Sequence, residues 1–218
     1  MLGHPPAASS VFYDGCMQEI LGAILTGGAS SRMGEDKATV EVAGRPMSAW
    51  VSEALRAALT ASGHIVVLGN TPVTGITQVQ DRPGAGPLSG LAAVADVAEL
   101  LGVAPQAVLI VAIDHPWVIP NTLRHLVDRY DGRAVVPVHH GVRQVTCAVY
   151  PMSVVAAASD AAPAAMGFQG LLDDRDVDEV APQTWMDWGE DGRSWFSVDE
   201  PRRITLGLER FGPPAKAQ

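Results

Sequence analysis

One stretch of the chain, residues 25–37, restricts the fold more than any other. It reads Leu-Thr-Gly-Gly-Ala-Ser-Ser-Arg-Met-Gly-Glu-Asp-Lys and continues directly from the apolar run Ile20–Leu25. A short apolar run of this kind is typical of a buried strand. Paired glycines after a strand let main-chain N–H groups approach an anion closely. The stretch therefore predicts a strand that ends in a phosphate-binding loop.

The same loop carries two basic residues, Arg32 and Lys37. An arginine offers phosphate oxygens a planar fork of donors, whereas a lysine acts as a point charge. We interpret both as catalytic residues that neutralise a triphosphate, which the backbone of Gly27 and Gly28 supports. The spacing fits neither the P-loop nor the dinucleotide fingerprint Gly-x-Gly-x-x-Gly. A solvated loop with incidental charges is the alternative.

Apolar runs and helix-start signals alternate along the first two thirds of the chain. Pro46, Pro87 and Pro120 each stand at the beginning of a segment with helical apolar spacing. The expected strands are 20–25, 65–68, 76–80, 107–112, 134–138 and 142–150, the last two joined by a turn. This order implies an α/β fold of three layers, α/β/α, around a mainly parallel, mixed sheet.

Asp114 follows the apolar run Ala107–Ala112 and precedes His115 and Pro116. Ligands of parallel sheets bind beyond the carboxyl ends of the strands, so Asp114 and the glycine loop should share one edge. Mg²⁺ is commonly bound by one or two carboxylates together with phosphate oxygens and water. We interpret Asp114 as a catalytic, metal-binding residue, with a simple turn before Pro116 as the alternative. His115 is expected to be a surface turn residue.

Composition narrows the class of protein. The net charge of −9 argues against nucleic-acid binding, because no basic stripe is available to replace phosphate counterions. Two cysteines fit a reducing cytoplasm, and no apolar run approaches the roughly 20 residues of a membrane span. Residues 1–18 lack the features of a signal peptide and are expected to be an N-terminal extension. Residues 19–218 are expected to form a single domain.

Residues 25–37 resemble the signature loop of the molybdenum cofactor guanylyltransferase family, Leu-x-Gly-Gly-x-Ser-x-Arg-Met-Gly-x-Asp-Lys, with Thr26 where alanine is usual. The segment Asp81–Leu91 is similar to the loop that packs over the base and ribose in that family. The resemblance implies a nucleotide-diphospho-sugar-transferase-like fold. The nucleotide-binding residues that it implies are Leu25, Thr26, Gly27, Gly28, Lys37, Asp81, Pro87, Leu88 and Gly90.

The resemblance also implies that Asp114 and Asp199 bind Mg²⁺. Asp199 lies in a segment that is similar to the family's second metal-binding segment, although Ser197 and Glu200 depart from its pattern. Without the resemblance, the acidic pair before Pro201 indicates a helix N-terminus, where carboxylates complement the helix dipole.

The acceptor half matches the family less well. The segment Met166–Leu172 lacks the basic residue that the family places near the pterin, so Arg143 and Gln144 are the expected acceptor contacts. The resemblance implies a nucleotidyltransferase that transfers GMP from GTP to the terminal phosphate of molybdopterin and releases pyrophosphate. Its expected partners are GTP and a phosphorylated pterin, without nucleic acid or membrane, and it is expected to be a monomer or a weak homo-oligomer.

Two other interpretations stay open at this point. The chain could be a related transferase that uses CTP on molybdopterin or GTP on another phosphorylated acceptor. It could also be a nucleotide-binding protein that has lost turnover, which the departures at Ser197, Glu200 and residues 167–170 leave open.

Overall fold

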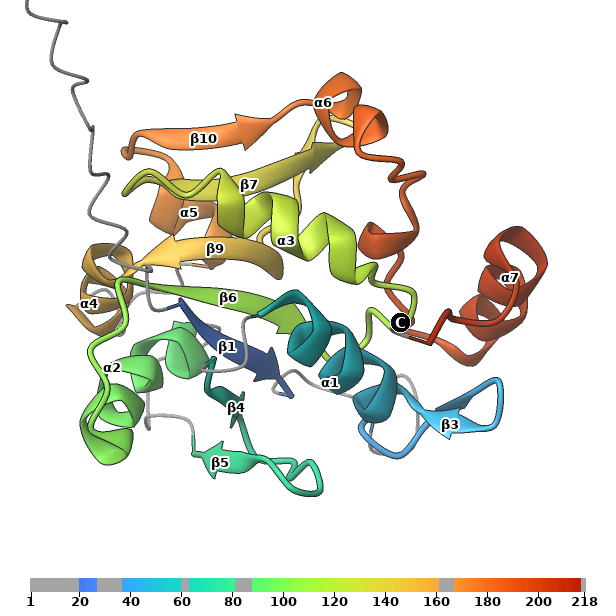
Figure 1. The fold of residues 1–218 in the computed structure, drawn as a ribbon, viewed down its shortest axis with the longest axis horizontal. Helices are drawn as coiled ribbons and strands as arrows, with labels where there is room; N and C mark the ends of the chain where they lie inside the picture. Colours follow the sequence, from blue (N-terminus) through green and yellow to red (C-terminus); the bar gives the residue numbers. More distant parts are fainter. Residues whose placement is uncertain (1–19, 27–36, 60–62, 81–87, 161–166, 217–218) are drawn as a thin grey trace, which may run out of the picture.

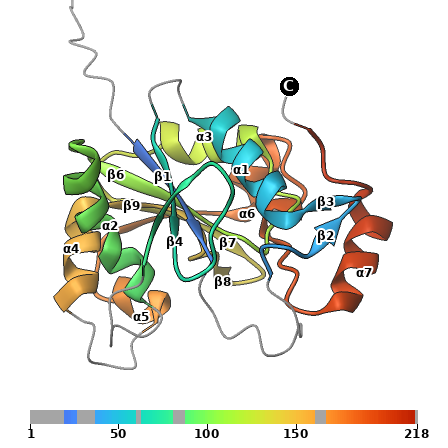
Figure 2. The same cartoon turned by 90° about the horizontal axis from the view of Figure 1, so that it is seen from below.

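The computed structural model describes residues 20–26, 37–59, 63–80, 88–160 and 167–216. Their main feature is an eight-stranded sheet in the order β10-β7-β9-β6-β1-β4-β5, with β8 paired to β7 (Figures 1 and 2). The strands are β1 (Ile20–Leu25), β4 (Ile65–Leu68), β5 (Thr77–Val79), β6 (Ala107–Ala112), β7 (Ala134–His139), β8 (Val142–Arg143), β9 (Cys147–Pro151) and β10 (Val177–Val180). A separate hairpin joins β2 (Glu41–Val42) to β3 (Arg45–Pro46).

The strand before the glycine loop lies in the middle of the sheet. β1 pairs in parallel with both β4 and β6, and Ala23 stands opposite Val66 and Ile110. Ile20 and Ile24 pack into the core on one face of the sheet, whereas Leu21 and Ala23 pack on the other, because successive side chains of a strand alternate. β10 is parallel to β7, and β9 is antiparallel to β6 and β7. The prediction of a mainly parallel, mixed sheet is confirmed.

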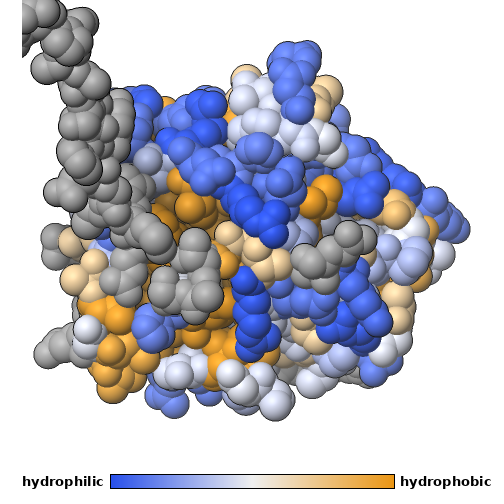
Figure 3. Space-filling view, viewed as in Figure 1, coloured by the Kyte–Doolittle hydropathy of each residue, from blue (hydrophilic) through white to orange (hydrophobic). Residues whose placement is uncertain are grey.

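Helices cover both faces of this sheet, which confirms the three-layer prediction. The core on one face includes α1 and α3, and the core on the other includes α2, α4 and α5 (Figure 2). The helices are α1 (Met47–Ala58), α2 (Ser89–Leu101), α3 (Pro120–Asp128), α4 (Met152–Asp160), α5 (Phe168–Leu172), α6 (Pro182–Asp187) and α7 (Pro201–Phe211). None of the helices in the described part of the chain combines the length and apolar character of a membrane span. The face seen in Figure 3 carries both hydrophilic and hydrophobic residues.

The expected strand 142–150 is wrong in one respect, because it is divided into β8 and β9. Val138 pairs with Arg143, but Val135 pairs with Val149, so the two strands change register between these points. Pro137 lies opposite the interruption, and proline has no N–H to donate to a ladder. The amide of Gln144 instead donates to the Pro137 carbonyl at 2.7 Å. A turn follows, in which the Cys147 amide donates to the Gln144 carbonyl at 3.0 Å, and it leads β9 to its place between β7 and β6.

The C-terminal helix α7 lies beside the β2–β3 hairpin, next to the layered sheet (Figures 1 and 2). Trp117 is the centre of this contact: its ring meets Phe196 edge-on, with centroids 5.6 Å apart, and its indole N–H donates to the Gly212 carbonyl at 2.8 Å. A Cβ added to Gly207 would lie 2.4 Å from the Trp117 ring. Glycine at position 207 is therefore what lets α7 pack this closely.

We expect the Gly207→Ala variant to lose about 1–3 kcal/mol of unfolding free energy, because a methyl group that overlaps a packed ring forces backbone shifts. Urea denaturation measures this loss. Gly167→Ala is the matched control: a Cβ at Gly167 meets nothing within 4 Å. Gly167 is the N-cap of α5, where alanine is less favourable than glycine, so this substitution should cost about 0.5 kcal/mol, less than the loss expected at Gly207. Equal losses in the two variants would contradict the packing argument.

Candidate active site

The exit of β1 is fixed on both sides. The main-chain amide and hydroxyl of Thr26 both donate to the Leu68 carbonyl, at 2.8 and 3.2 Å. The Ile113 amide donates to the Leu25 carbonyl at 3.0 Å. The candidates Leu25 and Thr26 therefore stand between the ends of β4 and β6, at the carboxyl edge of the parallel strands. Gly27, Gly28 and Arg32 lie outside the described residues.

Lys37, at the far end of the glycine loop, returns to the same edge. Its ammonium nitrogen lies 2.7 Å from Oδ2 of Asp114, which follows β6. Both side chains are mostly shielded, with 23% and 16% of their surface exposed. The structure thus brings together two predicted catalytic residues that are 77 positions apart in the chain.

The C-terminal segment folds back onto the Asp114 turn. The Val198 amide donates to the Asp114 carbonyl at 2.8 Å, so Asp199 directly follows a backbone contact with that turn. The Asp199 carboxylate is 41% exposed and lies 3.4 Å from the Arg203 guanidinium, one turn along α7. The C-terminal segment therefore reaches the carboxyl edge of the sheet, as a site shared by Asp114 and Asp199 requires. The role of Asp199 as a metal ligand stays a prediction.

His115 was expected on the surface, and this prediction is wrong. Only 3% of the residue is exposed. Its Nδ1 lies 2.9 Å from the Ser194 carbonyl, and its Nε2 lies 3.5 Å from both the Thr146 hydroxyl and Oδ1 of Asp114. The C-terminal segment covers the ring, and because Ser194 is 79 positions away, no local pattern could have revealed this burial.

The base-binding candidates lie at the start of α2. Leu88 is completely buried and packs in the core, so its side chain contributes to packing, and its role toward a nucleotide stays a prediction. Gly90 is in the first turn of the helix. Asp81 and Pro87 lie outside the described residues.

The acceptor candidates Arg143 and Gln144 lie on and directly after β8, which pairs with β7, two strands away from β6 in the sheet. The Arg143 guanidinium contacts Glu179 at 2.6 Å and Asp173 at 3.1 Å, and these hydrogen bonds, the Glu179 bond first, raise the pKa of Arg143. Arg143 also lines a cavity of about 500 Å³ that includes Gln169. The Gln144 side chain donates to the Val142 carbonyl. Their role toward an acceptor stays a prediction.

These features can be compared with known proteins. The model of the MobA-like NTP transferase domain family matches residues 22–179. The chain belongs to this family. A probable molybdenum cofactor guanylyltransferase from Natronomonas pharaonis is 34% identical over 223 aligned positions, which cover 89% of this chain and 100% of that relative. As a MobA-like transferase, the chain is a nucleotidyltransferase.

Solved structures agree with the fold of a MobA-like domain. Molybdopterin-guanine dinucleotide biosynthesis protein A from Archaeoglobus fulgidus superposes with a TM-score of 0.68 at 20% identity, covering 87% of this chain and 97% of that one. A Mycobacterium tuberculosis protein, solved as a complex with manganese, superposes with a TM-score of 0.59 at 18% identity and covers 88% of this chain and 99% of that one.

Two carboxylates of the MobA-like domain are the predicted ligands of a small divalent cation. Asp114 and Asp199 would provide hard carboxylate oxygens, and the Asp114 carboxylate already has a positive charge, the Lys37 ammonium, against it. Among the described residues, no group of three or more His, Cys, Asp or Glu side chains could hold a metal ion. A pair of carboxylates is nevertheless enough for Mg²⁺, which takes one or two carboxylates and completes its shell with phosphate oxygens and water.

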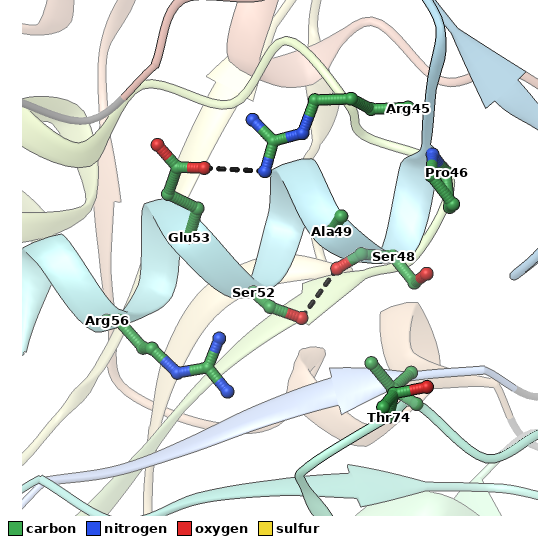
Figure 4. A pocket seen from close by; sticks show the side chains of 9 residues that line it. Arg45, Pro46, Ser48, Ala49, Ser52, Glu53, Arg56 and Thr74 are labelled. Atoms are coloured by element: carbon green, nitrogen blue, oxygen red, sulfur yellow. Dashed lines mark hydrogen bonds and ion pairs between the residues drawn. The ribbon is translucent and has the colours of Figure 1, made fainter.

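A second cavity of the MobA-like domain was not predicted. It measures about 340 Å³ and lies between α1 and the loop that contains Thr74 (Figure 4). Arg45 and Glu53 form an ion pair of 2.7 Å at one side, and Arg56 reaches from α1 toward Thr74 at the other (Figure 4). Its charged residues come from β3 (Arg45) and from α1 (Glu53 and Arg56), and Thr74 belongs to a separate loop, so the cavity depends on tertiary packing and not on a local pattern.

Proposed function

We propose that the chain transfers GMP from GTP to the terminal phosphate of molybdopterin and releases pyrophosphate. The observation that carries the proposal is the 2.7 Å contact between the Lys37 ammonium and the Asp114 carboxylate at the carboxyl edge of the sheet. It joins the end of the phosphate-binding loop to the carboxylate that would hold a metal. The names of the Natronomonas and Archaeoglobus proteins, which describe the guanylyl transfer and its dinucleotide product, support the choice of GTP and molybdopterin.

The residues of the chain act in this reaction by position and charge. Arg32 and Lys37 bind the β- and γ-phosphates, and the main chain of Gly27 and Gly28 supports the triphosphate. Lys37 exchanges the Asp114 carboxylate for a phosphate oxygen when GTP binds. Asp114 and Asp199 would hold Mg²⁺, which neutralises charge at the α-phosphate when bound.

The acceptor needs no activation by a basic side chain. Its terminal phosphate is already ionised near neutral pH and attacks the α-phosphate in line with the departing pyrophosphate. Catalysis then consists of positioning and electrostatic stabilisation, as in other phosphoryl-transfer enzymes. Arg143 and Gln144 are the proposed contacts of the acceptor.

Base selectivity is the first test of this function. Asp81, Pro87, Leu88 and Gly90 are proposed to contact guanine, and a site built for its hydrogen bonds leaves buried groups unpaired with any other base. We expect calorimetry with Mg²⁺ to show GTP binding at least about tenfold more tightly than CTP or ATP, which corresponds to roughly 1.4 kcal/mol. Tighter binding of CTP would favour a cytidylyltransferase, and equal binding would remove this loop from base recognition.

Asp199 can be tested against its neighbour in the chain. We expect Asp199→Ala to raise the Mg²⁺ concentration for half-maximal transfer and to slow transfer more than it weakens GTP binding, because its contact is made chiefly in the transition state. Glu200→Ala is the matched control, since the adjacent Glu200 carboxylate pairs with Arg202 instead. If both variants keep the wild-type metal dependence, Asp199 is only a helix-terminal residue.

A further inference from the structure

Glu190 is a carboxylate inside the protein, with only 3% of the residue exposed. Its two oxygens accept hydrogen bonds from Thr122 Oγ1 and the Gly192 amide, each at 2.7 Å, and from the amide and hydroxyl of Ser194. These four donors are neutral. Burying a carboxylate costs free energy unless hydrogen-bond donors satisfy its oxygens. The four donors around Glu190 supply this compensation and fix the position of its carboxylate.

Ser194 connects this carboxylate to the Asp114 turn. Its hydroxyl donates to Glu190 and also accepts from the Ile119 amide at 2.9 Å. Its carbonyl accepts from Nδ1 of His115 at 2.9 Å. A carbonyl can only accept, so this geometry assigns the proton to Nδ1. Glu190 therefore fixes Ser194, and Ser194 contacts both ends of the turn between His115 and Ile119.

The same connection reaches Asp114 along two routes. Through the side chains, the His115 ring that Ser194 holds packs against Asp114, with Nε2 3.5 Å from Oδ1; with the proton on Nδ1 this is a packing contact and not a hydrogen bond. Through the main chain, the segment that follows Ser194 leads to Val198, whose amide donates to the Asp114 carbonyl at 2.8 Å. Asp199 is the next residue. Both proposed metal ligands thus lie next to groups that contact Ser194 or follow it in the chain: Asp114 precedes His115, and Asp199 follows Val198.

We propose that Glu190 is a positioning residue for the cation site. Through Ser194, Glu190 holds Asp114 and Asp199 at a distance at which one divalent cation binds both. This inference rests on the proposed function, because it assumes that these two carboxylates form a metal site. In this role Glu190 acts through Ser194 and not on the substrate itself. The competing account is that Glu190 only attaches α3 to the C-terminal segment through Thr122 and contributes stability alone.

Manganese binding separates the two accounts without measuring activity. The free Mn²⁺ signal in electron paramagnetic resonance, corrected by a protein-free titration for the Mn²⁺ that GTP itself binds, gives the Kd of Mn²⁺ for the protein at saturating GTP. We expect Glu190→Gln, which keeps the size of the side chain and removes its charge, to raise this Kd about tenfold, as observed for residues that orient metal ligands. GTP binding without metal should change less than about twofold, since Lys37 and the glycine loop are untouched.

Val155→Ala is the matched control for stability. Val155 is fully buried in α4, in the core on the opposite face of the sheet from Trp195 and α3, so its truncation destabilises the fold without contacting the Asp114 turn. Ser194→Ala keeps Glu190 and removes the hydroxyl that joins it to Ile119. It supplies the test if Glu190→Gln fails to fold, with the same expected rise in Kd.

The proposal is overturned if Glu190→Gln and Ser194→Ala bind Mn²⁺ as the wild type does, or if Val155→Ala weakens Mn²⁺ binding to the same degree. A wild-type protein that binds no Mn²⁺ in the presence of GTP also overturns it. Failure of the proposed function has a different signature: Mn²⁺ and GTP bind, and the two variants weaken Mn²⁺ binding, but no pterin dinucleotide forms.

Discussion

We expect the Asp114→Asn variant to transfer GMP roughly a thousandfold more slowly than the wild type at any Mg²⁺ concentration, a loss of about 4 kcal/mol of transition-state stabilisation. An amide is a poorer ligand than a carboxylate for a hard cation. The variant also loses the partner of Lys37, whose ammonium lies 2.7 Å from Asp114 in the structure. Pyrophosphate release measured across a Mg²⁺ titration gives the rate, and circular dichroism should remain native.

The chain contains a close control for this substitution. Asp178 on β10 is shielded to the same extent as Asp114, with 14% against 16% of the side chain exposed, and it forms a bidentate ion pair with Arg129. Asp178→Asn therefore removes a comparable ion pair elsewhere in the sheet and should leave turnover unchanged. If Asp114→Asn retains the wild-type rate across the titration, Asp114 is merely a turn residue.

The second large effect is expected at Lys37. We expect Lys37→Ala to weaken GTP binding about 10- to 150-fold, because a lost charge-assisted contact with a phosphate costs roughly 1.5–3 kcal/mol. The fold should be retained, since the Lys37 side chain is 23% exposed and lies at the edge of the sheet. Calorimetry with GTP measures the affinity.

Arg129→Ala, which removes the cation of the Asp178 pair, is the control for a lost ion pair without a phosphate contact. It should leave GTP affinity as it is. If Lys37→Ala keeps the wild-type GTP affinity and transfer rate, the glycine loop is not the phosphate site. This conclusion holds even if the substitution changes the unfolding free energy.

The sequence predicts the nucleotide half of the fold well because its signals are local. β1 and β6 are continuous apolar runs, and Pro120 is the first residue of α3 as expected. Parallel pairing of β1 with β6 then brings the ends of these strands together, so the start of the glycine loop and Asp114 share one edge of the sheet. That Lys37 bonds directly to the carboxylate was not predicted, because side-chain pairing is not encoded in strand order.

The later part of the chain is less predictable because its determinants are tertiary. The division of residues 142–150 depends on Pro137 in the neighbouring strand. The burial of His115 depends on Ser194, and the approach of Asp199 depends on a bond between Val198 and Asp114. In each case the decisive partner is distant in sequence or belongs to another strand, where periodicity carries no information.

The most direct test of the central claim is to identify the products that the purified protein forms from GTP, molybdopterin and Mg²⁺. Mass spectrometry should find a guanine dinucleotide of the pterin, together with one equivalent of pyrophosphate per dinucleotide. The Asp114→Asn protein should form the dinucleotide and pyrophosphate roughly a thousandfold more slowly than the wild type. The Asp178→Asn protein should form both products at the wild-type rate. Formation of GDP and phosphate, or of a dinucleotide from CTP but not from GTP, would contradict the account.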